Sequence, residues 1–599
     1  MTRNFKFLLT AGAAIGGTLT LSARNDRPNV VIIVADDLGY ADVGFHNCNS
    51  EIQTPNIDQL ASEGVHCTTA YVTNAVSSPS RAGFLSGRYQ QRFGYEDNPG
   101  PFRLREGIHP GIPEGVKLMP DYLKDAGYKS ALIGKWHLGG EESDESFPTR
   151  KGFDRFFGFL EGATIYFHEE NEEGKIFDQE KLAKLNGGYF TDLIGDESIK
   201  FIKKNKKNPF LLYMAFNAVH SPLQAPEETI NLYSHIKDPQ RRKLCAMQQE
   251  MDKNVGRVLD YLKKEGLEDN TIVFFFSDNG GAPTDNHSCN YPFKGSKGTF
   301  YDGGIHTPFI VKWPGHVKEG QVYDKMVSSL DILPTVMHAA GLETPEVLDG
   351  VDLMPYFDGK NTNHPHDILY WKMNAKFAVR DLEWKLVFNT PDEGLMLFNI
   401  ANDPYEKNDL AAAMPEKVKE MQAKFDAWKA QNPKSLFGWQ PSVGKFIQHT
   451  DQNFEHIDQE HFKSIGNVNL SVIKNPKKNN LNPSNKVFCI ENNGASKLSG
   501  FAGNVARFNK HLRYLHIKVW MSEAGKVSCS LKGDKGFKIE HMPMNPCRQA
   551  GKWQDLVFDF GDFNRAVVSM GFFSPVLAKD GGYIYIDDIH YTDSAEPEI

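Results

Sequence analysis

The chain has 599 residues, too many for one hydrophobic core, so we expect at least two domains. Its composition, 40% hydrophobic and 24% charged, is that of an ordinary globular protein. A formal net charge of -9 argues against a general affinity for nucleic acid or anionic membrane, so an anionic substrate would need a local basic pocket.

The N-terminus has the pattern of a secretory signal peptide, which we assign to residues 1–23. A basic start with Arg3 and Lys6 precedes an apolar run that ends at Leu21 and is followed by small residues. The run is short and rich in Gly and Ala for a membrane span, and an uncleaved anchor is the alternative. We therefore expect secretion across the inner membrane, a periplasmic location and no stable membrane insertion.

The chain from residue 24 to 345 alternates buried-strand patterns with helical ones. This alternation predicts an α/β domain whose mostly parallel central sheet is flanked by helices. Continuous apolar runs predict strands at 29–37, 129–135, 209–216, 271–279 and 307–313. Helical spacing predicts helices at 54–64, 119–127, 196–204 and 251–266.

The pattern changes twice after this domain. Residues 346–445 combine short strand patterns with one closing helix, which predicts a small α+β subdomain. Residues 455–599 show alternating segments separated by Gly, Asn, Asp and Pro, which predicts a β-sandwich of the jelly-roll type. Its aromatic residues, Trp520 and Trp553 among them, indicate a carbohydrate-binding module or simply the sandwich core.

Seven cysteines are scattered along the chain with no CxxC and no metal-like spacing. An odd number leaves at least one free thiol. Cys529 and Cys547 are close enough in sequence to pair, but the connectivity does not follow from the sequence. No cysteine is a catalytic candidate.

Acidic side chains follow two of the predicted strands. Asp36 and Asp37 end the first, and Asp278 with Asn279 ends the fourth. Adjacent carboxylates repel each other unless a cation lies between them, and carboxylate and amide oxygens suit Ca²⁺ or Mg²⁺ better than zinc. An acid pair that merely caps a helix is the alternative reading.

Basic residues follow other strands at the same expected edge of the sheet. They are Lys135, His137, His220, Lys294 and Lys297. Each by itself would more often be a surface lysine or a structural histidine. Together, at the edge where such sheets bind ligands, they could hold a tetrahedral oxyanion.

The segment from Ser77 to Arg88 reads SSPSRAGFLSGR, a loop that leads into a helix whose N-terminus favours anions. A plain capping loop would account for it equally well. However, the segment resembles the signature of the formylglycine-dependent sulfatase family, in the alkaline phosphatase superfamily: Cys or Ser, then x-Pro-Ser-Arg, then x-x-x-Leu-Thr-Gly. Ser77 places the chain with the serine-type members, and Ser86 replaces the usual Thr.

Further segments similar to those of the family occur in the family's order. They are ADDLGYADVG, GKWHLG, HSP, SDNGG and KGSKGTFYDGG, so that the resemblance covers roughly residues 27 to 430. His306 departs from the pattern, because Arg is more usual there. We assign it no role.

The resemblance implies that a dedicated maturation enzyme oxidises Ser77 to formylglycine, also called 3-oxoalanine. It also implies a bound calcium ion, with magnesium as an alternative, whose ligands are Asp36, Asp37, the modified Ser77, Asp278 and Asn279.

The resemblance further implies a role for each basic residue. Arg81 would stabilise the hydrated aldehyde, and Lys135 and Lys297 would hold sulfate oxygens. His220 would assist the leaving alcohol, and His137 would serve the later elimination of sulfate.

Chains with a signal peptide and an added β-sandwich resemble bacterial carbohydrate sulfatases, so we expect a sulfated sugar or oligosaccharide as the substrate. The residues we predict to contact the sugar are Arg92, Asn98, His168 and Lys372. Two alternatives remain open on the sequence alone: a phosphatase or phosphodiesterase of the same superfamily with unmodified Ser77, and a non-catalytic glycan-binding protein.

Overall fold

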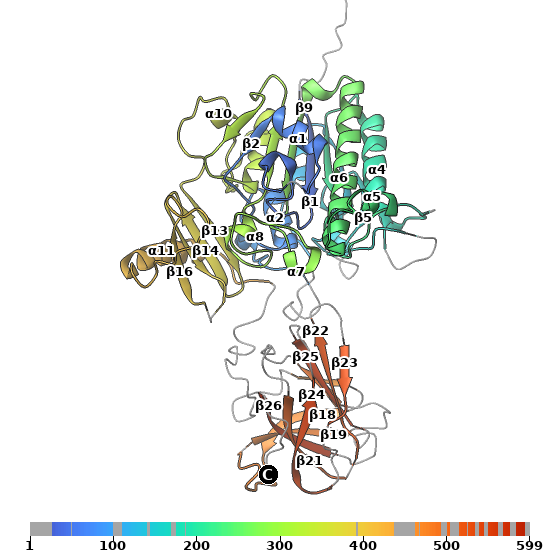
Figure 1. Cartoon of the computed structure of the whole chain (residues 1–599), viewed down its shortest axis with the longest axis vertical. Helices are drawn as coiled ribbons and strands as arrows, with labels where there is room; N and C mark the ends of the chain where they lie inside the picture. The colour runs from blue at the N-terminus through green and yellow to red at the C-terminus, as the bar shows by residue number, and fades with distance from the viewer. Residues whose placement is uncertain are drawn as a thin grey trace, which may run out of the picture. The chain divides into compact units, whose positions relative to one another are not determined.

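The computed structural model contains two compact units, Met1–Gly438 and Trp439–Ile599, each with an apolar core of its own (Figure 1). The described residues are 27–49, 51–99, 111–139, 144–168, 175–185, 187–390, 393–436, 462–465, 468–484, 486–492, 500–503, 514–523, 525–533, 538–543, 549–560, 567–574 and 583–592. Within them, no helix is both long and apolar enough to cross a bilayer. The predicted signal peptide lies outside the described residues.

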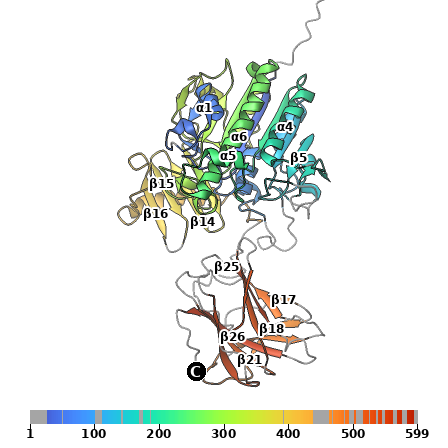
Figure 2. The ribbon, with the colours of Figure 1, turned by 45° about the vertical axis from the view of Figure 1, so that its right-hand side comes forward.

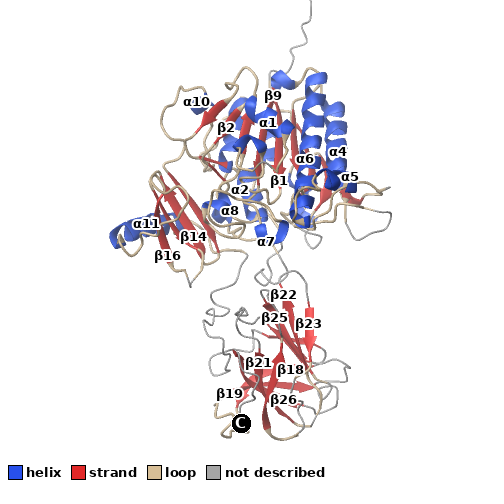
Figure 3. Cartoon of the chain, viewed as in Figure 1, coloured by secondary structure: helices blue, strands red, loops and turns tan. Residues whose placement is uncertain are grey.

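A mixed ten-stranded sheet forms the centre of the first unit (Figure 3). From one edge to the other its strands are β11 (Gln321–Tyr323), β2 (Val65–Cys67), β10 (Phe309–Lys312), β9 (Thr271–Ser277), β1 (Asn29–Ala35), β8 (Phe210–Ala215), β4 (Lys129–Lys135), β5 (Arg155–Phe159), β6 (Phe177–Asp178) and β7 (Lys181–Leu182). The five strands from β9 to β5 run parallel, whereas β10 runs antiparallel to β9. The predicted α/β fold with a mostly parallel central sheet is confirmed.

Helices cover both faces of this sheet, which explains why its central strands are apolar throughout. Every residue of β1 is buried, and alternate side chains enter two separate cores. One core is closed by α1 (Pro55–Ser62), α4 (Phe190–Asn205) and α6 (Pro239–Lys264), and the other by α2 (Ser77–Ser86), α3 (Met119–Lys124) and α9 (Ile332–Ala339). Figure 2 shows α4 and α6 side by side.

The four predicted helices coincide with α1, α3, α4 and α6. Helix α6 begins 12 residues earlier than predicted, at Pro239, where the side chain of Asp238 accepts a hydrogen bond from the backbone N–H of Gln240. Its first turns are polar, so the apolar periodicity from which the helix was predicted does not reveal this start.

The shorter elements of the unit are β3 (Ala70–Tyr71), β12 (Val327–Ser328), α5 (Glu227–Leu232), α7 (Pro283–Asn286), α8 (Asp302–Ile305), α10 (Met354–Phe357) and the 3-10 helices η1 (Gly44–His46), η2 (Gln90–Phe93), η3 (Asp144–Ser146), η4 (Pro148–Lys151), η5 (Glu268–Asn270) and η6 (Ser329–Asp331).

The later part of the first unit is a four-stranded antiparallel sheet with one helix. Its strands, in order, are β13 (Ile368–Met373), β14 (Lys376–Asp381), β15 (Trp384–Phe388) and β16 (Leu395–Asn399), and α11 (Pro415–Lys429) packs on β14 and β15. Lys385 of β15 is fully buried and forms ion pairs with Asp302 and Glu406. Because Asp302 begins α8, this charge cluster fastens the small sheet to the loop that precedes α8.

The second unit consists of two five-stranded antiparallel sheets. One has the order β17 (Phe462–Ile465), β20 (Gly500–Gly503), β25 (Val567–Phe573), β22 (Ser528–Gly533), β23 (Lys538–His541), and the other β18 (Val468–Lys474), β19 (Lys486–Asn492), β26 (Tyr583–Thr592), β21 (Tyr514–Met521), β24 (Trp553–Asp559). Phe488 and Ile517 of one sheet share a core with Phe572 of the other. The predicted β-sandwich is confirmed. Cys48, Cys67, Cys245, Cys289 and Cys489 are free thiols, and Cys547 lies outside the described residues.

Candidate active site

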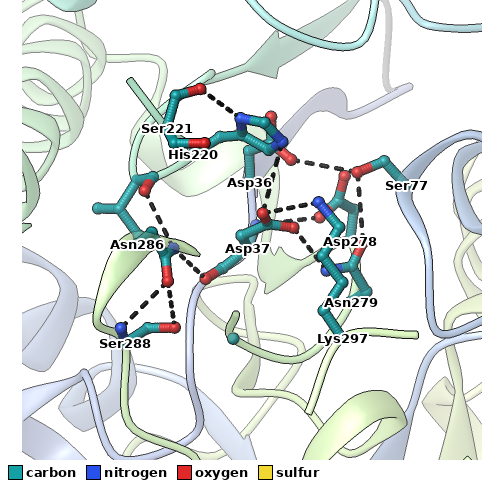
Figure 4. A network of polar contacts seen from close by, with 12 residues as sticks. Asp36, Asp37, Ser77, His220, Ser221, Asp278, Asn279, Asn286, Ser288 and Lys297 are labelled. Atoms are coloured by element: carbon teal, nitrogen blue, oxygen red, sulfur yellow. Dashed lines mark hydrogen bonds and ion pairs between the residues drawn. The ribbon is translucent and has the colours of Figure 1, made fainter. Parts of the chain in front are cut away.

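The predicted site residues meet at the carboxyl ends of the central parallel strands. Asp36 directly follows β1, Asp278 directly follows β9, and Lys135 is the last residue of β4. Strand β1 lies beside β9, and β8 is the single strand between β1 and β4, so their ends converge at one edge of the sheet. Ser77, the first residue of α2, points into the same place (Figure 4).

The five predicted metal ligands form one buried, hydrogen-bonded cluster. The hydroxyl of Ser77 donates to Asp36 Oδ1 and to Asn279 Oδ1, at 3.2 Å in each case. Asn279 Nδ2 donates to Asp37 Oδ1 at 2.8 Å, and the backbone N–H of Asp37 donates to Asp278 Oδ1 at 3.3 Å. The structure therefore brings together residues that are up to 243 positions apart in the sequence.

Each carboxylate of the cluster is paired with one of the predicted cations. Lys135 Nζ lies 2.7 Å from Asp36 Oδ2. Lys297 Nζ lies 2.7 Å from Asp37 Oδ2.

Arg81 pairs with the third carboxylate, that of Asp278, through Nε at 2.9 Å and Nη2 at 2.7 Å. Because a buried charge without a partner is costly, the three pairs account for how this many ionised groups are accommodated in the interior. Lys135 Nζ also lies 3.3 Å from the hydroxyl of Ser77, so a cation faces the proposed nucleophile position.

The surroundings shift the pKa values of the three acids in different directions. Burial raises the pKa of Asp36, and the ion pair with Lys135 offsets this only in part. Burial would also raise the pKa of Asp37, but Lys297 and His220 outweigh it and hold the pKa below its usual range. Arg81 likewise outweighs burial and lowers the pKa of Asp278. Asp37 and Asp278 are therefore ionised at neutral pH.

The donor set fits a hard divalent cation. Three buried carboxylates and the amide oxygen of Asn279 face one small region, and oxygen donors of this kind favour Ca²⁺ or Mg²⁺. One ligand atom from each of Asp36, Asp37 and His220 also lies within 4.8 Å of the others. The residues that could hold the cation are thus those predicted from the sequence, with His220 beside them.

The two predicted histidines have different surroundings, which determine how each can exchange a proton. His220 Nδ1 lies 2.6 Å from the carbonyl oxygen of Ser221, which can only accept, so Nδ1 carries a proton. His220 Nε2 is therefore the nitrogen that exchanges protons, and it lies 3.5 Å from Asp37 Oδ2. Burial lowers the pKa of His137 well below its ordinary value, and Lys135 and Arg81 lower it further, so His137 is neutral and can accept a proton.

The four residues predicted to contact sugar have different surroundings. Asn98 Oδ1 accepts a hydrogen bond from the backbone N–H of Ser78 at 2.9 Å, next to Ser77. Lys372 forms an ion pair with Glu96, two residues before Asn98. Asn98 and the Lys372–Glu96 pair therefore lie close to one another in the structure, and Asn98 contacts the start of α2 directly.

The other two of these residues make their contacts elsewhere. Arg92 forms an ion pair with Asp349 at 3.1 Å and hydrogen bonds with Gln431 and Asn432. His168 is buried, with its ring edge-on against Phe190. His306, which departs from the family pattern, lies between Asp302 and the carbonyl oxygen of Thr68, stacked on Phe293.

Sequence reasoning missed three buried residues that hold the site in place. Tyr213 of β8 accepts a hydrogen bond from Arg81 Nη1 at 2.7 Å. The hydroxyl of Tyr166 donates to the carbonyl oxygens of Asn217 and His220, at 2.5 and 2.8 Å.

The third is Asn286, whose Nδ2 donates to the carbonyl oxygens of Asp37 and Val219, both at 3.0 Å (Figure 4). Its own Oδ1 accepts hydrogen bonds from the backbone N–H and the hydroxyl of Ser288. The local sequence PTDNHS reads as an ordinary turn, so no signal along the chain distinguishes this asparagine.

Comparisons with known proteins identify the family of the chain. Residues 28–342 match the family model described as sulfatase, and residues 295–431 match the one described as N-sulphoglucosamine sulphohydrolase, C-terminal. Arylsulfatase J of Mus musculus is 31% identical over 464 residues, which cover 67% of this chain and 75% of that protein. N-acetylgalactosamine-6-sulfatase of Sus scrofa is 32% identical over 413 residues, covering 65% and 76%.

Solved structures give the same result. The crystal structure of Ps i-CgsB in complex with k-i-k-neocarrahexaose is similar with a TM-score of 0.64 and 34% identity, covering 69% of this chain and 96% of that one. The PsFucS1 sulfatase from Pseudoalteromonas sp. is similar with a TM-score of 0.57 and 26% identity, covering 70% and 93%. The chain therefore belongs to the sulfatase family and is a sulfuric ester hydrolase.

Proposed function

We propose that this enzyme hydrolyses sulfate esters on carbohydrates, with formylglycine formed from Ser77 and with calcium, or magnesium in its place, as the bound cation. The observation that carries the proposal is the position of the Ser77 hydroxyl, 3.2 Å from Asp36 and Asn279 and 3.3 Å from Lys135. A carbohydrate substrate is supported by the relatives, because one is an N-acetylgalactosamine-6-sulfatase and one was solved with neocarrahexaose.

The cation would be held by Asp36, Asp37, Asp278, Asn279 and the modified Ser77. It would supply positive charge that stabilises the sulfate oxygens, while the hydrated aldehyde would supply two hydroxyl groups on one carbon. An unmodified serine has one hydroxyl and no second one to drive sulfate release.

The basic residues would then act on the substrate. Lys135 and Lys297 would turn from the carboxylates toward the sulfate oxygens once the cation neutralises the acids. His220, protonated at Nε2, would give its proton to the departing sugar oxygen, and neutral His137 would take a proton as sulfate leaves. Arg81 would hold Asp278 and the group at position 77 in place.

The sugar-contacting residues remain part of the proposal. Asn98 and Lys372 have the stronger support, because Asn98 contacts Ser78 and Lys372 pairs with Glu96, two residues before Asn98. Arg92 and His168 have weaker support, because Arg92 pairs with Asp349 and His168 is buried against Phe190. We also propose a periplasmic location, which the signal-peptide pattern of residues 1–23 supports, and a serine-directed maturation enzyme as a transient partner.

Mass analysis of the Ser77 peptide tests the modification directly. Protein from a host with a serine-directed maturation enzyme should show a loss of about two hydrogens or the corresponding hydrate. The same protein should be assayed against sulfated mono- and disaccharides and against matched phosphate esters. Turnover of phosphate esters with an unmodified Ser77, and none of sulfate esters, would favour the phosphatase alternative.

A further inference from the structure

The β-sandwich carries an aromatic cluster that lies outside its shared core. The cluster consists of Trp520 of β21, Trp553 of β24, and Tyr583 and Tyr585 of β26. These residues alternate with the core residues of the same strands, for example Val519 and Ile584, so they occupy the opposite face of the sheet. The register places Trp520 opposite both Trp553 and Tyr585.

The rings of the cluster pack closely but are not equally covered. Trp520 lies 5.6 Å from Tyr583 and 5.3 Å from Tyr585, centroid to centroid. The two tryptophans are buried, with exposed fractions of 6% and 5%, whereas both tyrosines are half-buried. The tryptophans thus form the buried base of the cluster, and the tyrosines expose part of their ring surface.

A lysine-rich loop is fixed onto this cluster. Trp553 Nε1 donates to the carbonyl oxygen of Lys477 at 2.8 Å, and Lys477 Nζ lies 5.3 Å from the ring centre of Trp520. The loop is closed by a hydrogen bond of 3.1 Å from Asn475 Nδ2 to the carbonyl oxygen of Ser484. Hydrogen bonds within the loop and to Trp553 therefore hold this loop in one conformation.

The loop packed on the aromatic cluster is basic, although the whole chain has a net charge of -9. Residues 468–486, which form β18 and this loop, contain four lysines and no Asp or Glu. Lys477 and Lys478 of the loop and Lys552, next to Trp553, are exposed, whereas Lys474 and Lys486 alternate with Ile473 and Val487 and therefore lie on the other face of the sheet. The exposed Glu491, opposite Tyr583 on β19, adds a hydrogen-bond acceptor next to the rings.

We propose that this face of the sandwich is a second binding site for the sulfated glycan, separate from the active site. Half-exposed tyrosine rings match the apolar C–H faces of sugar rings, and Lys477 and Lys478 of the adjoining loop match sulfate groups. Such a site would hold a polymeric substrate and raise its local concentration for the catalytic unit. The inference rests on the proposed carbohydrate substrate, and it adds a binding role for residues that take no part in hydrolysis.

Affinity electrophoresis of the full-length protein, in gels that contain carrageenan or the same polymer after chemical desulfation, tests this site. Wild-type protein should be retarded by the sulfated polymer and much less by the desulfated one. The double variants Tyr583→Ala/Tyr585→Ala and Lys477→Glu/Lys478→Glu should each bind about fivefold more weakly or worse. Retardation of either variant equal to that of wild type, or equal retardation of wild type by both polymers, would overturn the proposal.

Two controls separate this outcome from other causes. Lys263→Glu/Lys264→Glu changes the charge equally at the end of α6 in the other unit, and it should bind like wild type. Turnover of a small sulfated monosaccharide should be unchanged in all these variants. Because the gel measures binding without turnover, failure of the proposed activity and failure of the second site give different results.

Discussion

Lys297 Nζ lies 2.7 Å from Asp37 Oδ2, and this contact joins the loop before α8 to the second residue after β1 across 260 positions of sequence. The contact places an ammonium group directly on a candidate metal ligand. Two positively charged groups cannot share one carboxylate oxygen at no cost, so binding of a divalent cation at Asp37 favours release of Lys297 toward an anionic substrate. In the proposed mechanism, the pair would couple binding of the cation to release of Lys297 toward the sulfate group.

Replacement of the proposed nucleophile should stop turnover without unfolding the protein. In Ser77→Ala the hydroxyl among Asp36, Asn279 and Lys135 is removed, and sulfate release should fall by about a thousandfold or more. The thermal unfolding curve should be almost unchanged, because only one small polar atom is lost. Ser198→Ala, which removes an equally buried hydroxyl from α4, outside the signature segment, is the matched control and should retain activity. Steady-state sulfate release by Ser77→Ala would contradict the assignment.

Removal of the metal should abolish activity and lower stability together. A chelator should inactivate the enzyme, and calcium should restore it. Calcium at a hundredfold excess over its dissociation constant should stabilise the folded state by about 2.7 kcal/mol, measured as a higher Tm.

The matched variants identify where the cation binds. Asp37→Asn should lose the Tm response to calcium, whereas Asp269→Asn, at the opposite end of β9, should keep it. An unchanged calcium response in Asp37→Asn would place the cation elsewhere.

Asn286 should act as a positioning residue for Asp37 and His220. In Asn286→Ala the backbone carbonyl oxygens of Asp37 and Val219 lose their shared donor, so both neighbouring side chains can shift. We expect kcat/KM to fall by about tenfold or more and the calcium concentration needed for half-activation to rise.

Asn290→Ala provides the comparison for a purely structural effect. Asn290 is also a buried asparagine of this loop, and it binds the backbone of Gly281 rather than that of a proposed metal ligand. It should lower Tm without changing the calcium requirement. An equal calcium requirement in both variants would mean that Asn286 has a structural role only.

The ion pair between His366 and Asp331 should make stability depend on pH. Burial opposes the charged imidazolium, but Asp331, 2.8 Å away, outweighs it and raises the pKa of His366. A pKa raised by folding contributes stability that is complete below the unfolded value of about 6.5 and is lost as pH rises through the folded value. His366→Gln should therefore lower the free energy of unfolding by about 2 kcal/mol at pH 5.5, with a smaller deficit above neutral pH.

Thermal unfolding of wild type and His366→Gln across this pH range measures the difference. His338→Gln removes a histidine that pairs with Asp352 at the surface, and it should change Tm little at any pH. A stability deficit in His366→Gln that grew with rising pH would mean that folding lowers the pKa of His366 instead of raising it.

The amino-acid sequence determined the central strands and the helices between them, and it predicted the residues that meet in the candidate active site. Asp36, Asp278 and Lys135 each follow or end an apolar run, and parallel strands bring such ends to one edge of a sheet, so adjacency in space followed from position in sequence. The family resemblance added the prediction that Ser77 is the residue converted to formylglycine.

Only the tertiary structure decided which side chains support that site. Asn286 reaches the carbonyl oxygens of Asp37 and Val219 from a turn far along the chain, and Tyr213 meets Arg81 from an apolar strand. The aromatic cluster of the sandwich likewise depends on register between strands, which sets which faces of Trp520 and Tyr585 meet. Such contacts depend on how distant segments pack together, so they cannot be predicted from the local periodicity of the sequence.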